Sequence, residues 1–342
     1  MKKDSASITI HDIASELGLH ASTVSRALND NPAVSKKTRA LIQAKAKAMN
    51  YRPNRMAAAL RKGRSDLLGV IVPAIDRHFF ASVIRGIEEE ADKAGLHVMF
   101  CQSYDDSDRE RKLIEGLQRL RVDGILLSVA KDGGNEPDFY QSIIDSGTPV
   151  HFFDNAPRGF DAAAVVIDDR RGAYLATKHL VNQGVSAIAH LRGPQHLDIY
   201  RDRFKGYQDA LLEAGMAVRE EFIVDITSHF DNGRKAFAAL WSRDAKPTGI
   251  FSASDYSAAG VMQAAQEQGL KIPRDLAVIG FANEPFTDLM TPTLSSVDQQ
   301  TLSMGRKSTR RMIAHLKGDD SDNQRIILEP SVIERGSSRL KQ

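Results

Sequence analysis

The stretch TIHDIASELGLHASTVSRAL, residues 9–28, decides the architecture of the first part of the chain. Thr9 and Asp12 have the spacing of a capping box, in which the two side chains satisfy backbone N–H groups at a helix start. The apolar residues that follow keep helical spacing, Gly18 allows a tight turn, and a second short helix covers 21–28. Two short helices that meet across a glycine-containing turn predict a helix-turn-helix unit.

The residues that follow this unit predict one further stable helix and one marginal helix. Asn29-Asp-Asn-Pro32 ends the second helix, and Ser35 caps a third helix that runs to about Asn50. Residues 54–63 are fewer than the roughly 12–15 that an isolated helix needs for marginal stability. Leu60 stands there among small and basic residues, so the segment either folds only when it binds a partner or packs as an ordinary linker helix.

The formal net charge of +2 divides unevenly along the chain. Residues 1–65 contain 13 Lys and Arg against 4 Asp and Glu, a balance of +9, so the remaining residues carry −7. A basic head on a mildly acidic body is typical of a module that binds a polyanion and is joined to a domain with another task. On charge alone, a basic solvated surface is the competing interpretation.

Beyond residue 66 the pattern changes to strands that alternate with helices, which predicts parallel sheets covered on both faces. About 270 residues is long for one such sheet, so we expect two sheets that face a cleft. The expected strands cover 67–72, 97–101, 122–128, 149–153, 165–167, 187–191, 222–224, 248–252 and 276–281. The expected helices include 80–94, 108–120, 172–183, 199–214, 232–242 and 256–268.

The composition excludes several classes of protein. With 342 residues, 42% of them hydrophobic and 26% charged, the chain has the length of two or three domains of a globular protein. Its single cysteine, Cys101, cannot form an intrachain disulfide, which favours a reducing compartment. No apolar run reaches the roughly 18–20 residues of a membrane span, and the start lacks a secretory signal. We therefore expect a cytoplasmic protein without a membrane partner.

The start of the second helix presents side chains that could read DNA. Ala21, Ser22, Ser25 and Arg26 project outward together, while the apolar residues between them suit the inner face. Hydroxyl groups can form hydrogen bonds with phosphates or base edges, and an arginine can form two hydrogen bonds with one guanine. An alanine can make only apolar contact. The alternative is a purely structural role, in which the two serines cap a short helix and hydrogen-bond to water.

A second group of candidate residues lies near the ends of the predicted strands, where open α/β sheets bind ligands. The group comprises Phe79, Phe80, Asp154, Arg203, Asp255 and Asn283. Carboxylate, guanidinium and amide groups hydrogen-bond neighbouring hydroxyls in pairs, which favours a polyhydroxylated ligand. Any one of these polar residues could instead cap a helix or form a surface ion pair, and Phe80 could equally belong to the core.

Motifs of the common enzyme classes are missing from the sequence. It contains no Gly-x-Gly-x-x-Gly, no Walker loop, no Gly-x-Ser-x-Gly and no Cys/His cluster at metal spacing, so we expect no cofactor, no metal and no catalytic residue. The histidines are scattered. A transport-type solute-binding protein or a sugar-modifying protein could use the same cleft, although the basic head counts against both.

Ordered motifs run through the first sixty residues: Thr9-Ile-x-Asp-Ile-Ala14, Ser22-Thr-Val-Ser-Arg26, Asn29, Val34-Ser35, Thr38-Arg39, Tyr51-Arg-Pro-Asn54 and Ala57-x-x-Leu60. Together they resemble the lactose-repressor (LacI/GalR) family of bacterial regulators, and the resemblance extends over essentially the whole chain. It implies a sequence-specific DNA-binding regulator, a repressor of transcription, that is associated with the nucleoid.

The resemblance also implies roles for single residues. Ala21, Ser22 and Arg26 would read bases and Leu60 would enter the minor groove, whereas the backbone-positioning places fall on Thr9, Ser25, Asn29, Ser35, Thr38 and Asn54. His20, Ala57 and Arg61 complete the expected DNA-binding set. His20 stands where the family usually has Ser or Thr, which puts one capping or phosphate contact in doubt.

In the body, the resemblance implies a periplasmic-binding-protein-like sensor of two doubly wound subdomains. Its effector positions match Phe79, Ser128, Asp154, Arg203, Ser254, Asp255 and Asn283, with Phe80 beside them. Ser254 and the sequence Phe281-Ala-Asn283 depart from the family's usual residues, so a sugar-like effector is expected but its identity cannot be read.

The resemblance gives the domain boundaries as well. We expect a helix-turn-helix domain over 1–52, a hinge helix and linker over 53–65, and an effector-binding and dimerisation domain over 66–342. Within the last, one subdomain would comprise about 66–167 with 298–324, and the other 168–297 with 325–342. Family members bind as homodimers, so the double-stranded operator should be a pseudo-palindrome, and ligand-driven movement of the lobes would form or melt the hinge helices.

Overall fold

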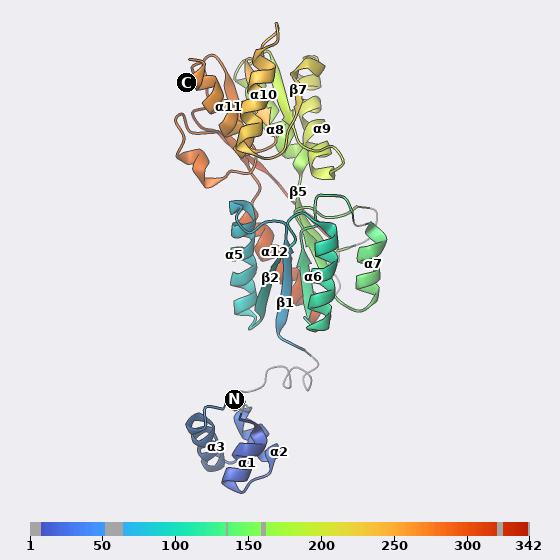
Figure 1. Cartoon of the computed structure of the whole chain (residues 1–342), viewed down its shortest axis with the longest axis vertical. Coiled ribbons are helices and arrows are strands. Elements are labelled where there is room, and N and C mark those ends of the chain that lie inside the picture. The colour runs from blue at the N-terminus through green and yellow to red at the C-terminus, as the bar shows by residue number, and fades with distance from the viewer. Residues whose placement is uncertain (1–7, 52–63, 135, 159–161, 320–323, 341–342) are drawn as a thin grey trace, which may run out of the picture. The chain divides into compact units, whose positions relative to one another are not determined.

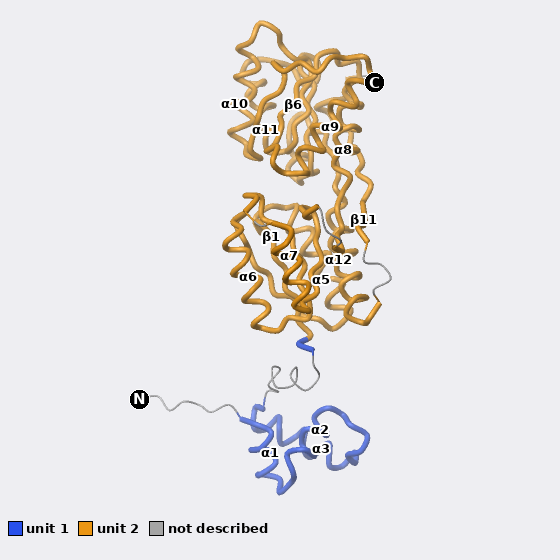
Figure 2. Tube along the Cα trace, turned by 90° about the vertical axis from the view of Figure 1, so that its right-hand side faces the viewer, with its two compact units in different colours: residues 1–65 blue, residues 66–342 orange. Residues whose placement is uncertain are grey.

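A computed structural model describes residues 8–51, 64–134, 136–158, 162–319 and 324–340 of the chain (Figure 1). The chain separates into two compact units, residues 1–65 and residues 66–342 (Figure 2). We call the first unit the head and the second the body, and describe each by itself. Among the described residues, no helix has the length and apolar character to cross a membrane.

The described part of the head contains α1 (Ile10–Leu17), α2 (Ala21–Leu28) and α3 (Lys36–Ala48). The predicted capping box at the start of α1 is confirmed, because the Thr9 backbone N–H donates to Asp12 at 2.7 Å and the Asp12 N–H donates to Thr9 Oγ1. Gly18 ends α1 in the left-handed region at φ 63°. The core between the helices is built on fully buried apolar side chains from each of them, Ile13, Val24 and Ile42.

The first lobe of the body is a six-stranded parallel sheet. Its order is β11 (Arg325–Leu328), β5 (Ala164–Ile167), β4 (Val150–Phe153), β3 (Gly124–Leu127), β1 (Leu67–Val72) and β2 (His97–Gln102). Alternate residues of β1 face opposite ways: Val70 packs with the helices α5 (His78–Lys93) and α12 (Thr301–Leu316), whereas Ile71 packs with α6 (Ser107–Arg119) and α7 (Pro137–Asp145). Helices therefore cover both faces, as the strand pattern predicted.

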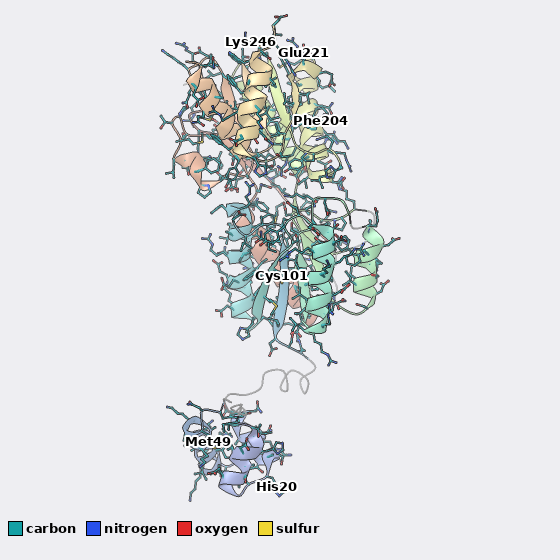
Figure 3. All side chains as sticks on the ribbon, viewed as in Figure 1. His20, Met49, Cys101, Phe204, Glu221 and Lys246 are labelled. Atoms are coloured by element: carbon teal, nitrogen blue, oxygen red, sulfur yellow. The ribbon has the colours of Figure 1, made fainter. Side chains whose placement is uncertain are left out.

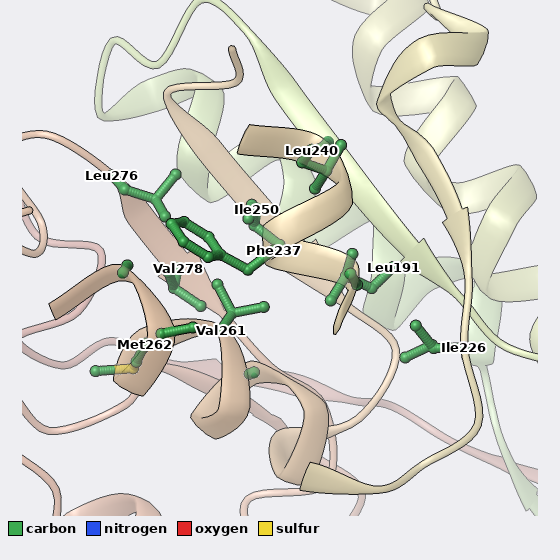
Figure 4. Close-up of a cluster of buried hydrophobic side chains, with 14 of the residues drawn as sticks. Leu191, Ile226, Phe237, Leu240, Ile250, Val261, Met262, Leu276 and Val278 are labelled. Carbon is green, nitrogen blue, oxygen red and sulfur yellow. The ribbon is translucent and has the colours of Figure 1, made fainter. Parts of the chain in front are cut away.

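The second lobe is a four-stranded parallel sheet. Its order is β7 (Ile223–Asp225), β6 (Ile188–Arg192), β8 (Gly249–Ser252) and β9 (Ala277–Ile279). The helices are α8 (Asp169–Asn182), α9 (Asp198–Glu213), α10 (Phe230–Trp241) and α11 (Asp255–Glu267), and α10 and α11 enclose the apolar cluster of Figure 4. Two short 3-10 turns, Glu220–Phe222 and Pro285–Asp288, and an antiparallel pair, β10 (Ser296–Asp298) with β12 (Ser331–Ile333), complete it.

The chain passes between the two lobes three times, after β5, after β10 and after β11. The third crossing corrects the boundary expected from the sequence, which placed residues 325–342 entirely in the second lobe. Residues 325–328 form β11, whose parallel register joins Arg325 to Ala164 and Leu328 to Ile167 in the first lobe. Three of the four residues of this strand are apolar, and its backbone forms hydrogen bonds with β5 along one side, so the crossing follows Leu328.

Two glycines let α5 and α12 approach closely in the first lobe. A Cβ atom at Gly86 would lie 2.4 Å from the Leu302 carbonyl oxygen, and one at Gly305 would lie 2.1 Å from the Val83 carbonyl oxygen. Both obstacles are backbone atoms, which cannot rotate away as a side chain could. The pair of glycines thus sets the distance between α5, which follows β1, and α12, which follows the second crossing.

Candidate functional site

The outward face of α2 carries the head's candidate residues. Ser22 and Arg26 are exposed and, within the described residues, neither side chain has a hydrogen-bond or ion-pair partner, whereas Ala21 and Ser25 are half-buried. The inner face of α2 is anchored by the buried side chains of Val24 and Ala27. The helix backbone therefore presents a guanidinium and a hydroxyl at the surface, with their hydrogen-bonding groups available.

His20 is the N-cap residue of α2, and its exposed side chain makes no capping hydrogen bond (Figure 3). Ser35, by contrast, caps α3 by accepting from the Thr38 backbone N–H at 3.1 Å, and its Oγ lies 2.8 Å from Thr38 Oγ1. Asn29 closes the end of α2 by donating to the Ser25 carbonyl oxygen at 2.7 Å. Like Thr9, these residues stabilise helix ends in the head itself.

The predicted DNA contacts of the hinge fall on Asn54, Ala57, Leu60 and Arg61. All four lie outside the described residues, and their roles stay predictions.

The body contains a cavity of about 410 Å³ lined by residues of both lobes. The structure brings five of the sequence-predicted effector residues together on its wall: Phe79, Phe80, Asp154, Arg203 and Ser254. They come from the start of α5, the end of β4, the first turns of α9 and the loop after β8. This position, beyond the carboxyl ends of strands in both sheets, is where open α/β folds bind ligands.

The aromatic part of the wall comes from the first lobe. The rings of Phe79 and Phe80 meet edge to face with their centroids 5.0 Å apart, and both side chains are buried. They also belong to the apolar core of that lobe, so the alternatives of core residue and binding residue are not exclusive here. Packing fixes the two rings at the cavity surface, where an apolar sugar face could stack.

Arg203 is held by three partners and a ring. Its Nε donates to Asp169 Oδ1 at 2.7 Å, its Nη1 to the Ala253 carbonyl oxygen at 2.9 Å and its Nη2 to Gln299 Oε1 at 3.4 Å. The guanidinium carbon lies 3.7 Å from the ring centroid of Phe281. Burial raises the pKa of Asp169 to about 6, although Arg203 opposes that rise. The arginine is thus a preorganised donor whose charge is largely matched by a buried carboxylate.

Asp154 is placed by an unusual backbone turn at the end of β4, at φ 58°. Ser128 donates a hydrogen bond to its Oδ2 at 3.2 Å, so Ser128 supports the carboxylate from behind and does not line the cavity. Burial raises the pKa of Asp154, while Lys131 and Arg203 oppose the rise. A buried acceptor with a cation nearby suits paired hydroxyl donors.

Asp255 and Asn283 are turned away from the cavity. The Asp255 carboxylate accepts from Ser296 Oγ at 2.6 Å and from the Glu284 backbone N–H at 2.9 Å, which ties the start of α11 to neighbouring loops. Asn283 Oδ1 accepts from Arg335 Nη2 at 2.8 Å. These two predicted effector residues therefore have internal partners and line no part of the cavity.

Sequence reasoning missed several polar residues of the wall. They include Arg77, Lys131, Tyr256, Glu284 and Gln299. Tyr256 directly follows the predicted residue Asp255, and Glu284 directly follows the predicted residue Asn283. The sequence therefore indicated the correct loops but not which of two neighbouring residues lines the cavity.

The wall carries equal numbers of basic and acidic side chains, namely Arg77, Lys131 and Arg203 with Asp105, Asp154 and Glu284. The described residues contain no group of three or more His, Cys, Asp or Glu that could hold a metal. The arrangement offers paired donors and acceptors beside aromatic rings, without an excess of either charge. It can bind a hydroxyl-rich molecule by hydrogen bonds and stacking.

Comparison with known proteins gives matches over both units. The model of "Bacterial regulatory proteins, lacI family" matches residues 9–54, and that of "Periplasmic binding protein-like domain" matches residues 177–338. The HTH-type transcriptional regulator DegA of Bacillus subtilis is 32% identical over 96% of this chain and 98% of its own. The ribose operon repressor of Halalkalibacterium halodurans is 30% identical over 97% of each chain.

A solved structure of similar architecture is the transcriptional regulator CelR–cellobiose complex. It matches with a TM-score of 0.72 at 26% identity and covers 96% of this chain and 99% of its own.

Proposed function

The chain belongs to the lacI family of bacterial regulatory proteins, and from this membership we propose that it binds a pseudo-palindromic operator as a homodimer under the control of a sugar-like effector. Its relatives are transcriptional regulators, so the chain is a DNA-binding transcriptional regulator and not an enzyme. Such a protein acts where the bacterial DNA is, at the nucleoid in the cytoplasm.

The observation that carries the DNA-binding part is the outward face of α2. Ser22 and Arg26 stand exposed and without partners among the described residues, on a helix whose opposite face is fixed in the core. In helix-turn-helix proteins the start of this second helix enters the major groove. Arg26 can donate two hydrogen bonds to a guanine, and Ser22 can serve a base or a phosphate.

Selection of duplexes from a random library with the full chain tests this assignment. We expect a pseudo-palindromic site, and we expect Arg26→Ala to weaken binding to it by about 1–3 kcal/mol, the range for a bidentate arginine–guanine contact. The same substitution should weaken binding to a scrambled duplex much less. Arg85→Ala, which removes a 64%-exposed arginine of α5, is the matched control. Equal losses on both duplexes would contradict a base-reading role.

The effector part rests on the balanced polar wall of the cavity. A thermal-shift screen of mono- and disaccharides and their phosphates should yield a stabilising ligand. Adding that ligand to the protein–DNA complex should change the affinity for the selected duplex, and the direction of the change decides between a ligand that releases and one that recruits. A ligand that binds without any effect on DNA affinity would favour the alternative, a solute-binding protein.

The homodimer part is supported by the exposed edge of the first lobe. β2 is the last strand of its sheet, and Met99 and Phe100 on it are 36% and 39% exposed. An apolar edge strand invites pairing with another chain, and a second copy would supply the second head that a pseudo-palindrome requires. Sedimentation should show a dimer that Phe100→Asp dissociates. Leu212→Asp, at a 78%-exposed position of α9, should leave it intact, and a monomeric parent chain would exclude this interface.

The control mechanism that we propose is allosteric. A ligand in the cavity contacts both lobes, so its binding favours one lobe arrangement over others. In a dimer, lobe movement changes the spacing of the two segments 53–65 and thereby the binding of the heads to the half-sites.

A further inference from the structure

One polar side chain on the cavity wall has an unused hydrogen-bonding atom. Glu284 follows β9 in the second lobe and is only 5% exposed. Its Oε2 is buried and has no hydrogen-bond partner among the described residues. A buried carboxylate oxygen without a donor costs free energy, because the water that solvated it in the unfolded chain has not been replaced. A donor brought by a bound molecule would remove that cost.

The same carboxyl group interacts with residues of the first lobe. The backbone N–H of Phe79, at the start of α5 in the first lobe, and Arg77 both lower its pKa. The first amides of a helix lack partners within the helix and carry the positive end of its dipole, so they suit a carboxylate. Beside this contact, Arg77 reaches into the second lobe, with its guanidinium carbon 4.6 Å from the Tyr256 ring centroid and Nη1 3.4 Å from the Ser228 carbonyl oxygen.

We propose that Glu284 is an effector-binding residue: its carboxylate, close to Arg77 of the first lobe, accepts a hydrogen bond at Oε2 from a hydroxyl group of a neutral, polyhydroxylated ligand. This inference rests on the proposed function of the cavity. A second anion beside Glu284 would be repelled, since Asp255 already lies next to it, so phosphorylated and acidic sugars are excluded from this part of the wall. A ligand bound to Glu284 adds to the contacts between the two lobes, which couples its binding to closure of the cleft.

The surroundings of Glu284 make its charge sensitive to pH. Burial and the neighbouring Asp255 raise its pKa to about 7, while Arg77 and the Phe79 N–H oppose the rise. The charged and titratable groups that interact with it are Arg77, Asp255 and Tyr256. Beyond these, Asp76 interacts with Tyr256, Arg335 interacts with Asp255, and His229 lines the same cavity. A hydroxyl donor favours the charged carboxylate, so the ligand should bind more tightly as pH rises through 7.

Calorimetric titration of the full chain tests the proposal, with D-ribose, D-glucose, cellobiose and glucose 6-phosphate as probes at pH 6, 7 and 8. The tightest neutral sugar should gain up to about tenfold in affinity from pH 6 to pH 8, because about a tenth of a group is charged one unit below its pKa. Glu284→Gln should weaken binding at pH 8 by tenfold or more and remove the pH dependence, since its uncharged amide oxygen is a weaker acceptor than a carboxylate and does not titrate.

Two further variants complete that experiment. Glu284→Ala should bind as weakly as the glutamine variant, and Glu115→Gln, which neutralises a 61%-exposed glutamate of α6, should bind like the parent chain. Parent-like affinity in both Glu284 variants, or a pH dependence that persists in Glu284→Gln, would overturn the proposal. Binding of the phosphorylated sugar alone would overturn the neutral class yet leave a sugar-controlled regulator standing.

A measurement without ligand separates this proposal from the proposed function. Hydrogen exchange of the peptide that contains Phe79 should accelerate several-fold in Glu284→Ala and stay unchanged in Glu115→Gln, because only the former removes the carboxyl group that interacts with the Phe79 N–H. Unchanged exchange in Glu284→Ala would refute the interaction of Glu284 with the start of α5 even if none of the sugars bound. Faster exchange together with no sugar binding would refute the ligand contact at Oε2 and the sugar-like effector together.

Discussion

Replacement of Arg203 by methionine should destabilise the second lobe, and the loss should grow with pH. The side chains of Arg203 and Asp169 are each only 7% exposed and meet at 2.7 Å, so the variant leaves a buried carboxylate without its cation. Breaking a buried pair in this way costs about 3–5 kcal/mol. Methionine preserves most of the apolar volume against Phe281, which confines the effect to charge and hydrogen bonding.

The pH dependence follows from the state of Asp169. Burial raises its pKa in the folded chain to about 6, above the ordinary value of 3.8, and removal of Arg203 raises it further. The protonated carboxyl needs no cation, so the variant should lose little stability near pH 5. Above the folded-state pKa the folded chain must bury the unpaired charge of Asp169. Each unit by which the pKa rises further lowers the free energy of unfolding by about 1.4 kcal/mol. The loss should therefore be largest near pH 8.

Urea unfolding can be followed at the single tryptophan, Trp241, which lies on α10 in the same lobe as the ion pair. The difference in unfolding free energy between Arg203→Met and the parent should be several-fold greater at pH 8 than at pH 5. The double variant Arg203→Met/Asp169→Asn should recover most of the loss at pH 8, whereas Arg201→Met, which breaks an exposed pair on the same helix, should change little. A loss that is equal at both pH values would refute the reasoning.

Other outcomes can be checked with standard measurements. The affinity for non-selected duplex DNA should fall with salt at a log–log slope several units negative, because the +9 head displaces counterions; a flat salt response would contradict this. Gly305→Ala should lower the unfolding free energy of the first lobe by about 1–3 kcal/mol, since its Cβ would lie 2.1 Å from the Val83 carbonyl oxygen; an unchanged urea midpoint would show that the helices separate freely. Burial lowers the pKa of His190 to about 3, so below pH 6.5 the imidazole is protonated in the unfolded chain but stays neutral in the folded chain. The free energy of unfolding therefore falls by up to about 1.4 kcal/mol for each pH unit below 6.5. His190→Phe, which keeps the stack on Phe251, should flatten this acid loss, and acid unfolding at the parent's pH would refute that role.

The strands were predictable where burial alone dictates the pattern. Each predicted strand of both sheets is present within a few residues of its expected bounds, because parallel strands buried on two faces read as short apolar runs. α7, α12 and β11 were not among the predicted elements. α12 buries small and sulfur-containing side chains under a strongly basic surface, and β11 is defined by its pairing with Ala164–Ile167, which is remote in sequence.

The candidate site shows a different limit. Its location followed from strand ends, but the side chain that faces the cavity is decided by backbone turns that composition does not reveal. Ala282 and Asn283 have φ values of 126° and 52°, and this turn directs Asn283 to Arg335 and Glu284 to the cavity. Arg203 was recognisable from its position, whereas Asp169 was not, because the two meet only after α8 and α9 pack together.

The three crossings between the lobes have a consequence for synthesis on the ribosome. Residues 67–167 supply five of the six strands of the first lobe, but that lobe stays incomplete until α12 and β11 have been made, close to the end of the chain. The head, whose core comes from residues 10–51, can fold long before that point. A chain that stops early would thus carry a DNA-binding head on a body whose first lobe is incomplete, so quality control of unfinished chains matters more for this architecture than for one in which the head is made last.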